Sequence, residues 1–584
     1  MRACVVAGLS AAYLAYVFRL RGPLFWSAGL GDWMDPYFIN ALLEHWYHVA
    51  RSLANPASPP MFFPVRHALG YSHGLLLYAP FYVPLRAFFH PFQAQTLTLL
   101  FVIEIGIICL YLFLRRLRLS FFESALLTAF FVSSENVMNG TTAVWMQRAS
   151  VFVIPPVLVL AQTARRAGGA SGVALAVLAG AGASLMYVQD FYTAHFAALL
   201  AVVIAVAAVE WPAGIQTWPV KLWRRQTGAL RMALIVVAVA AVATVVILMT
   251  GGGETRVVGI RLAARDWRRP ALLAMLAASF LAWRNRAIVK PLHAAAHRQV
   301  QGFAVGLFIG AGVFFWIYLD AFSEHRGFPK EEVWHALVER DPYLSVRTFV
   351  LCAAVAVLAW VPWLRVDRRA KRYGLWLVAV SACVWLIPLR FGDVSIWTAF
   401  VARLPGFGVI RDPKRIIYLY ELAAVIAIAA IVAPPSTRAY RLSVIMFALA
   451  LMLAHPNRER FDYERSNAVF DRWVAAPTVI DPSCRSFFIL KASAEYMSRS
   501  PHMGSLYGID ATFVALNHSR PTLNGYSAWY PDGWELWNPQ EDTYPGRVRR
   551  WIETHNLSGV CEFDIDARTM RPWAEARAPQ SLIR

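Results

Sequence analysis

Two aspartates three residues apart, Asp32 and Asp35, stand in the sequence Gly-Asp-Trp-Met-Asp-Pro that ends at Pro36. Paired carboxylates could supply a general base and a hydrogen-bonding or metal-binding partner. The alternative is structural, because either aspartate could cap the N-terminus of a helix with Pro36 at its first position. Spacing alone favours capping.

A second polar group follows in the same region, with Glu44 and His45 adjacent and Ser72 and His73 beyond a proline-rich turn. Carboxylates and histidines can bind metal ions. Adjacent residues of a helix point to different faces, however. The pattern therefore favours a polar network over a metal site.

A third group lies in the glycine-containing stretch 404–415, where Arg411, Lys414 and Arg415 precede an apolar segment. Arginine forks could bind a phosphate at the level of lipid head groups. The plainer interpretation is that these side chains reach out to lipid phosphates. Three further polar residues stand at the ends of apolar segments and could join the same site: Gln147, Arg148 and Asp190.

The amino-acid composition indicates the class of protein in which these residues stand. Of 584 residues, 58% are hydrophobic and 16% are charged, which is far below the charge content of ordinary soluble domains. So much apolar surface cannot be buried in soluble cores of this size, so the chain is predicted to be a polytopic membrane protein. The net charge is +20, but the bases form short clusters between apolar segments and no nucleic-acid-binding module is recognised. We therefore expect no nucleic-acid partner.

Thirteen apolar segments are candidates for spanning helices, although several are short enough to need flanking residues to reach the length of about 20 that a bilayer requires. They are centred on residues 3–18, 97–114, 121–135, 150–163, 171–187, 194–210, 233–250, 270–283, 301–318, 348–364, 375–389, 416–433 and 442–454. With a cytoplasmic N-terminus, the six expected cytoplasmic loops carry 20 Lys and Arg and one acid, Asp367. This bias follows the positive-inside rule, although loop 251–269 carries five arginines on the opposite side.

Two large regions lie outside these segments, and both are expected on the external face. Loop 19–96 contains a helical pattern at 36–53 that favours a helix in the plane of the membrane interface. The tail, 455–584, has strand patterns at 486–490 and 559–565 and a helix pattern at 546–556. We therefore expect a transmembrane domain over 1–454, all-α, and a small external α/β domain over 455–584.

Four stretches of the chain resemble a known family. They are GDWMDPYFINALLEHWYH (31–48), PPMFFPVRHALGYSHGLLLYAPFY (59–82), LPGFGVIRDPKR (404–415) and RPTLNGYSAWYPDGWEL (520–536). Together with the first helix, the external loop and the many spans, they resemble the GT-C superfamily of polytopic glycosyltransferases. Within it, the chain is similar to little-characterised bacterial GT-C-like and YfhO-like membrane proteins, which have Ser-Asp where this chain has Ser72-His73.

The resemblance implies a GT-C fold and a polyprenyl-phosphate-linked sugar as donor. It implies a glycan or other cell-envelope acceptor, in a bacterial inner membrane with a periplasmic tail. It makes Asp35, or else Asp32, the general base. It also implies that Arg411, with Arg415 or Arg148, stabilises the negative charge of the leaving phosphate. A divalent metal is possible but not implied. Two other functions stay open: a transporter or flippase of lipid-linked glycans, and a non-catalytic scaffold that binds envelope glycans.

The tail contains two cysteines, Cys484 and Cys561, and the other four lie in apolar segments. In an oxidising external compartment, thiols in one small domain form bridges that persist. We therefore expect a disulfide between them. Two free thiols are the alternative.

Overall fold

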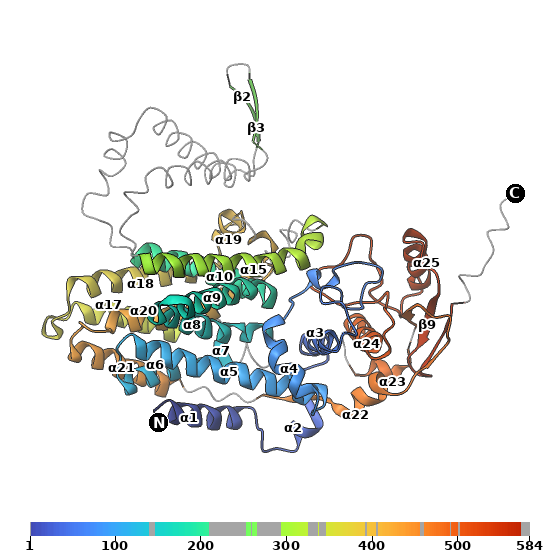
Figure 1. Ribbon diagram of the computed structural model, residues 1–584, viewed down its shortest axis with the longest axis horizontal. Helices are drawn as coiled ribbons and strands as arrows, with labels where there is room; N and C mark the ends of the chain where they lie inside the picture. Colours follow the sequence, from blue (N-terminus) through green and yellow to red (C-terminus); the bar gives the residue numbers. More distant parts are fainter. Residues whose placement is uncertain are drawn as a thin grey trace.

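The computed structural model has a bundle of long helices at one end and a C-terminal region with a small mixed sheet at the other (Figure 1). The structure describes residues 2–138, 146–208, 253–257, 260–264, 294–324, 337, 346–391, 394–403, 407–455, 461–490, 492–499 and 503–573.

The bundle contains the apolar helices. They are α1 (Arg2–Val17), α5 (Pro91–Arg116), α6 (Phe121–Val132), α8 (Ile154–Ala167), α9 (Gly169–Gln189), α10 (Phe191–Ala208), α15 (Ala294–Glu324), α17 (Val346–Ala359), α18 (Arg368–Leu386), α20 (Ile416–Val432) and α21 (Arg438–Ala454). Shorter elements between them include α7 (Glu135–Met138), η4 (Met146–Val153), β2 (Gly253–Val257), β3 (Ile260–Ala264), η6 (Pro362–Leu364), β4 (Arg390–Phe391), β5 (Val394–Ser395), α19 (Ile396–Ala399), η7 (Val401–Arg403), η8 (Phe407–Val409) and η9 (Pro413–Arg415).

Four stretches of the described chain are long and apolar enough to cross a membrane: Pro91–Arg116, Gly169–Gln189, Arg298–Ala321 and Pro413–Val432. Eleven of the thirteen predicted apolar segments coincide with helices of the bundle. The other two, 233–250 and 270–283, lie outside the described residues. The helical character of these eleven segments is thus confirmed, while the count of thirteen spans stays a prediction.

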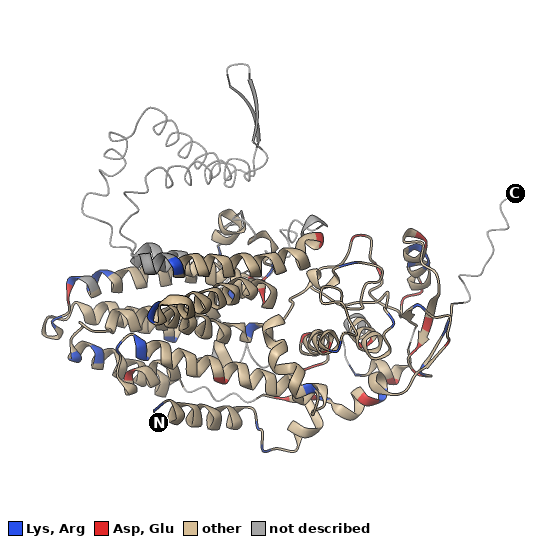
Figure 2. Cartoon of the chain, viewed as in Figure 1, with Lys and Arg blue, Asp and Glu red and all other residues tan. Residues whose placement is uncertain are grey.

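The bundle has one basic end. Figure 2 shows Lys and Arg gathered at the turns that join α5 to α6, α17 to α18 and α20 to α21, away from the C-terminal region. These turns belong to the loops that the sequence predicts to be cytoplasmic. The C-terminal region and the starts of α5 and α20 lie at the opposite end (Figure 1). Charge and fold therefore distinguish the two ends of the bundle in the same way.

The packing of α9 against α15 positions the chain around Ser72. A Cβ placed on Gly306 of α15 would lie 2.0 Å from the carbonyl oxygen of Val177, so only glycine permits this approach. Further along α15, the hydroxyl of Tyr318 donates to the carbonyl of Ser72 at 2.8 Å. The next turn of the loop is held by the Gly74 N–H, which donates to Val188 at 2.8 Å. The first loop is thereby fixed to the ends of both helices.

The first loop forms short elements around one central helix. They are α2 (Leu24–Ser27), β1 (Ala28–Leu30), α3 (Asp35–Ala50), η1 (Ala68–Tyr71), η2 (Leu76–Tyr78) and α4 (Ala79–Arg86). In Figure 1, α3 is seen end-on while the bundle helices run across the view, so α3 is steeply inclined to them. Protein encloses α3, and its polar residues Asn40, Glu44 and His45 are buried. Its helical spacing of polar residues therefore reflects internal hydrogen bonds rather than one exposed face.

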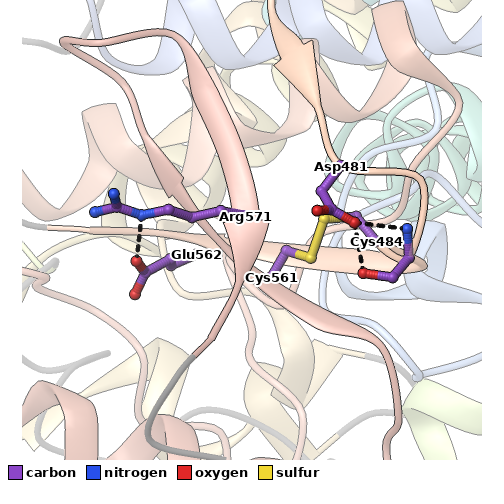
Figure 3. The surroundings of a disulfide bond; sticks show 6 residues. Asp481, Cys484, Cys561, Glu562 and Arg571 are labelled. Carbon is purple, nitrogen blue, oxygen red and sulfur yellow. Dashed lines mark hydrogen bonds and ion pairs between the residues drawn. A yellow bond between two sulfur atoms is a disulfide. The ribbon is translucent and has the colours of Figure 1, made fainter.

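The C-terminal region contains the small sheet. Its elements are β6 (Tyr463–Ser466), α22 (Asn467–Phe470), η10 (Asp471–Ala475), β7 (Val479–Ile480), β8 (Ser486–Ile489), α23 (Ala494–Met497), α24 (Met503–His518), α25 (Tyr544–Thr554), β9 (Val560–Asp564) and β10 (Thr569–Pro572). The strand order is β7-β10-β9-β8, with β8 and β9 parallel and β9 and β10 antiparallel. A disulfide joins Cys484, just before β8, to Cys561 in β9, with a Cα–Cα distance of 5.5 Å (Figure 3).

The C-terminal region and the first loop share one hydrophobic core. Strand β1 pairs antiparallel with β6, and the hydroxyl of Tyr37 in α3 donates to Asp510 in α24 at 2.6 Å. The indole N–H of Trp551 in α25 donates to the carbonyl of Phe63 at 2.9 Å. The tail therefore closes over the first loop instead of folding on a core of its own.

Candidate active site

Asp35 begins α3 and is held by the C-terminal region. Its Oδ1 accepts a hydrogen bond from the hydroxyl of Tyr526 at 2.8 Å. The residue before the helix is Met34, and no side chain caps this N-terminus. Asp32 instead accepts the Met34 N–H at 3.1 Å, inside the turn that leads into α3. The side chain of Asp35 therefore does not cap α3, in contrast to the capping alternative that its spacing suggested.

Arg148, from η4, lies in a group of polar side chains contributed by distant segments. Its Nη1 donates to the hydroxyl of Tyr418 in α20 at 2.6 Å, and its Nη2 lies 3.6 Å from Oδ2 of Asp412. The same carboxylate oxygen lies 3.5 Å from Nε of Arg415. Asp412 therefore holds two guanidinium groups together. We call Arg148, Asp412, Arg415 and Tyr418 the arginine cluster.

Asp35 lies within electrostatic reach of Arg148 in the arginine cluster. Burial and the neighbouring charge of Arg415 lower the pKa of Arg148 to about 10, while Tyr418, Asp412 and Asp35 act in the opposite direction. Arg148 is only 7% exposed, so these charges interact with little screening by water. Asp35, 113 positions earlier in the sequence, exerts the smallest of these effects on Arg148.

His73 and Asp190 form a pair beside the arginine cluster. Nδ1 of His73 lies 3.0 Å from Oδ1 of Asp190, and Thr193 donates to Oδ2 through both its N–H and its hydroxyl. Burial raises the pKa of Asp190, but His73, Arg415 and Thr193 together lower it more, so the carboxyl stays ionised. Because Asp190 is 1% exposed and the His73 side chain 14%, the pair presents its imidazole toward the accessible side.

Tyr192 connects this pair to Arg411 and Arg415. Its ring meets the His73 ring edge-on at 5.5 Å, and the guanidinium of Arg415 lies 4.7 Å from its centroid. Its hydroxyl accepts the backbone N–H of Arg411 at 3.0 Å. Lys414 donates its own N–H to Asp412 at 3.3 Å, so the whole 411–415 turn is fixed to this group.

The remaining residues predicted from the sequence lie nearby or elsewhere. Gln147 is buried next to Arg148 in η4. Glu44 accepts hydrogen bonds from Tyr82 and Arg86, each at 2.5 Å. Nε2 of His45 lies 3.1 Å from the carbonyl of Pro56. The structure gives Glu44 and His45 partners inside the first loop and does not bring them to the arginine cluster.

The site also contains tyrosines that the sequence motifs did not identify as candidates. They are Tyr192, Tyr418, Tyr526 and Tyr530. Burial raises the pKa of Tyr530 to about 12, and Arg411 and Asp35 exert smaller, opposite effects on it. Tyr530 therefore lies where the charges of both residues are felt. The sequence signal was the density of aromatic residues in 520–536, which is high for an exposed loop.

No group of three or more metal-binding side chains gathers within the part of the chain that the structure describes.

No protein-family model and no curated protein matches the chain. Among solved structures, it is similar to the oligosaccharyltransferase AglB of Archaeoglobus fulgidus in complex with an inhibitory peptide and a dolichol-phosphate, at 12% identity and a TM-score of 0.45. That match covers 96% of this chain and 69% of the other. A second structure of the enzyme, tethered to an acceptor peptide containing the NVT sequon, matches at 12% identity and a TM-score of 0.42, over 90% and 64%.

This chain thus spans about two thirds of the length of the enzyme whose structures it matches. At these identities and TM-scores, the likenesses carry no argument about activity or ligands.

Proposed function

We propose that the protein is a membrane glycosyltransferase. It transfers a sugar from a polyprenyl-phosphate donor to a cell-envelope acceptor at the end of the bundle that carries the C-terminal region. The observation that carries this proposal is geometric. Asp412 holds Arg148 and Arg415 together. The loop whose Tyr526 donates to Asp35 also contacts Phe191, beside Tyr192 of the same site. One site then contains a proton acceptor and the positive charge that an anionic leaving group requires.

In the proposed reaction, Asp35 removes the proton from an acceptor hydroxyl. The hydroxyl oxygen forms a bond to the anomeric carbon as the bond from that carbon to the phosphate oxygen breaks. The polyprenyl phosphate leaves with the bonding electrons, and Arg148, Arg411 and Arg415 stabilise its negative charge. Tyr526 holds one oxygen of Asp35, which leaves the other to accept the proton.

The placement of the polar residues favours an enzyme over a transporter. Asp35, Arg148, Asp190 and Arg415 all stand at helix ends or in the turns before them. Transporters usually bind their substrates midway through the bundle, between broken helices. A site at one end of the helices fits chemistry on a lipid head group.

A radiolabelled-donor assay tests the proposal. The purified full-length protein in nanodiscs is mixed with polyprenyl-phosphate-linked glucose, mannose, galactose or N-acetylglucosamine and with delipidated cell envelopes as acceptor. We expect label to move to the envelope fraction with one donor, and polyprenyl phosphate to be released in equal amount. Absence of transfer with every donor, together with donor translocation in proteoliposomes, would establish the transporter instead.

A further inference from the structure

The loop 526–537 presents an aromatic surface beside the candidate active site. Among the described residues from 461 onward, the large apolar side chains that are exposed are Val479 and Trp537. Trp537 is 42% exposed, although tryptophan is usually well buried. Trp26 of α2 is exposed as well, at 61%, so exposure alone does not mark a binding surface. What distinguishes Trp537 is its place in an aromatic cluster, because clustered aromatic rings supply much of the energy of many binding contacts.

Trp537 is held in place by two other aromatic rings. Tyr530 stacks on Trp534, with centroids 4.9 Å apart and ring planes inclined by 13°. Trp537 meets both rings edge-on, at 4.0 Å from Tyr530 and 4.9 Å from Trp534. The indole N–H of Trp534 donates to the carbonyl of Leu523 at 2.9 Å, which anchors the cluster to the core. The exposed ring is therefore preorganised.

The charge around this aromatic cluster is negative. Residues 531–542 contain four acids, Asp532, Glu535, Glu541 and Asp542, and no Lys or Arg, in a chain with a net charge of +20. Asp532 and Glu535 are exposed. Arg547 and Arg550 of α25 pair with Glu541 and Glu535, so the excess negative charge of this loop comes from Asp532 and Asp542. A surface with this excess does not attract anionic polymers or lipid head groups. Carboxylate oxygens instead accept hydrogen bonds from hydroxyl groups, and an aromatic ring covers an apolar face.

The aromatic cluster is continuous with the candidate active site. Tyr530 belongs to the cluster and also lies within electrostatic reach of Arg411 and Asp35. Four residues earlier in the same loop, Tyr526 donates to Asp35. A molecule lying on Trp537 would therefore contact the same loop that holds Asp35 through Tyr526.

We propose that Tyr530, Trp534 and Trp537, with Asp532, form the acceptor subsite, and that the acceptor is a neutral glycan whose pyranose ring stacks on Trp537. This inference rests on the proposed function and specifies its substrate class. It excludes acidic polysaccharides and polyol phosphates as acceptors. The aromatic face contacts the C–H face of the sugar, and Asp532 accepts hydrogen bonds from its hydroxyl groups.

The test measures binding rather than transfer. Full-length protein in nanodiscs is titrated by calorimetry with neutral hexasaccharides (cellohexaose, mannohexaose and chitohexaose) and with hexagalacturonate. We expect binding of at least one neutral oligosaccharide and none of hexagalacturonate. Trp537→Ala should weaken that binding by about tenfold or more, and Trp537→Phe by less, because the smaller ring still stacks. Val479→Ala, which removes the other exposed apolar side chain of the region, is the matched control and should bind normally.

Preferred binding of hexagalacturonate, or equal affinities of wild type and Trp537→Ala, would overturn the inference. So would fluorescence quenching by brominated lipids that Trp537→Phe removes, because Trp537 would then contact the membrane. A protein that transfers sugar but binds none of these oligosaccharides through Trp537 refutes the subsite alone. One that binds them through Trp537 but transfers nothing refutes the proposed function alone.

Discussion

At the scale of single residues, Arg148 is positively charged although its burial disfavours the charged form. A guanidinium tolerates this because its planar fork reaches two partners at once, here Tyr418 and Asp412. Arg148→Lys keeps the charge but cannot contact both partners in the same geometry. We expect donor turnover to fall by about tenfold or more while the protein stays folded.

The matched control is Arg118→Lys, an exposed arginine at the basic end of the bundle. It should leave turnover unchanged, because a lysine reaches lipid phosphates as well as an arginine does. If Arg148→Lys is as active as wild type, the arginine cluster does not bind the leaving phosphate through a fork.

His45 illustrates a polar residue that serves the fold. Burial lowers its pKa from 6.5 to about 4, with smaller effects from Pro56 and His48. Below pH 6.5 the unfolded chain binds a proton that the folded protein excludes, so stability falls as the pH drops toward 4. The loss is on the order of 3 kcal/mol.

His45→Gln keeps an N–H for the Pro56 carbonyl but does not titrate. We therefore expect its free energy of unfolding to fall less than that of wild type between pH 7 and pH 4.5. Chemical denaturation in detergent at both pH values measures the difference. An identical pH dependence of the two proteins would mean that His45 is protonated without cost in the fold.

The sequence identified most of the side chains that meet around Arg148, but not how they meet. Asp35, Arg148, Asp190 and Arg411 stand out because charged residues are rare beside apolar segments. Asp412 and Tyr418 were harder to recognise, since an acid between arginines and a tyrosine near a membrane are both common. Their role depends on a contact between η4 and α20, which are about 270 residues apart and have no local pattern in common.

At the scale of elements, α3 and α24 are joined by a buried ionic group. Asp510 accepts hydrogen bonds from Tyr37 at 2.6 Å and Tyr496 at 2.8 Å, and it pairs with Arg499. The side chains of Asp510 and Arg499 are 0% and 5% exposed. Asp510→Asn leaves the guanidinium buried without its counter-charge, which should cost about 3–5 kcal/mol of folding free energy.

Glu495→Gln is the control for this prediction. It breaks the Arg472–Glu495 pair, whose side chains are 58% and 61% exposed, and should cost less than about 1 kcal/mol. Thermal unfolding in detergent compares the two variants. Equal stability losses would show that the α3–α24 contact does not depend on the buried charge.

The apolar helices could be predicted from hydropathy because a bilayer-length apolar run has few alternative structures. The burial of α3 could not. Its polar residues at helical spacing predicted a helix with one exposed face, but Asn40 and Glu44 are buried and make hydrogen bonds to Pro91 and Tyr82. Its position in the plane of the membrane interface stays a prediction. Only the tertiary fold shows that the tail covers this helix, because Tyr37 and Asp510 are far apart in the sequence.

At the scale of the whole molecule, the predicted external position of the C-terminal region determines the expected redox state of Cys484 and Cys561. The disulfide between Cys484 and Cys561 closes a loop with a sequence separation of 77, worth roughly 4 kcal/mol in the chain-entropy model. If the C-terminal region is external, this bridge forms in the cell. Non-reducing peptide mapping of native membranes should recover the two cysteines as one linked peptide pair. Recovery of both as alkylated free thiols would contradict the external placement of the region.

If Asp35 accepts the proton of the acceptor hydroxyl, changing it to Asn should stop transfer, and the same change at the neighbouring Asp32 should not. Both changes preserve shape, and Asn at 32 can still accept the Met34 N–H. We predict that Asp35→Asn lowers the rate of transfer from radiolabelled donor by about 10²–10⁴-fold with unchanged donor binding, while Asp32→Asn stays near the wild-type rate. Wild-type turnover by Asp35→Asn, or loss of activity confined to Asp32→Asn, would contradict the account.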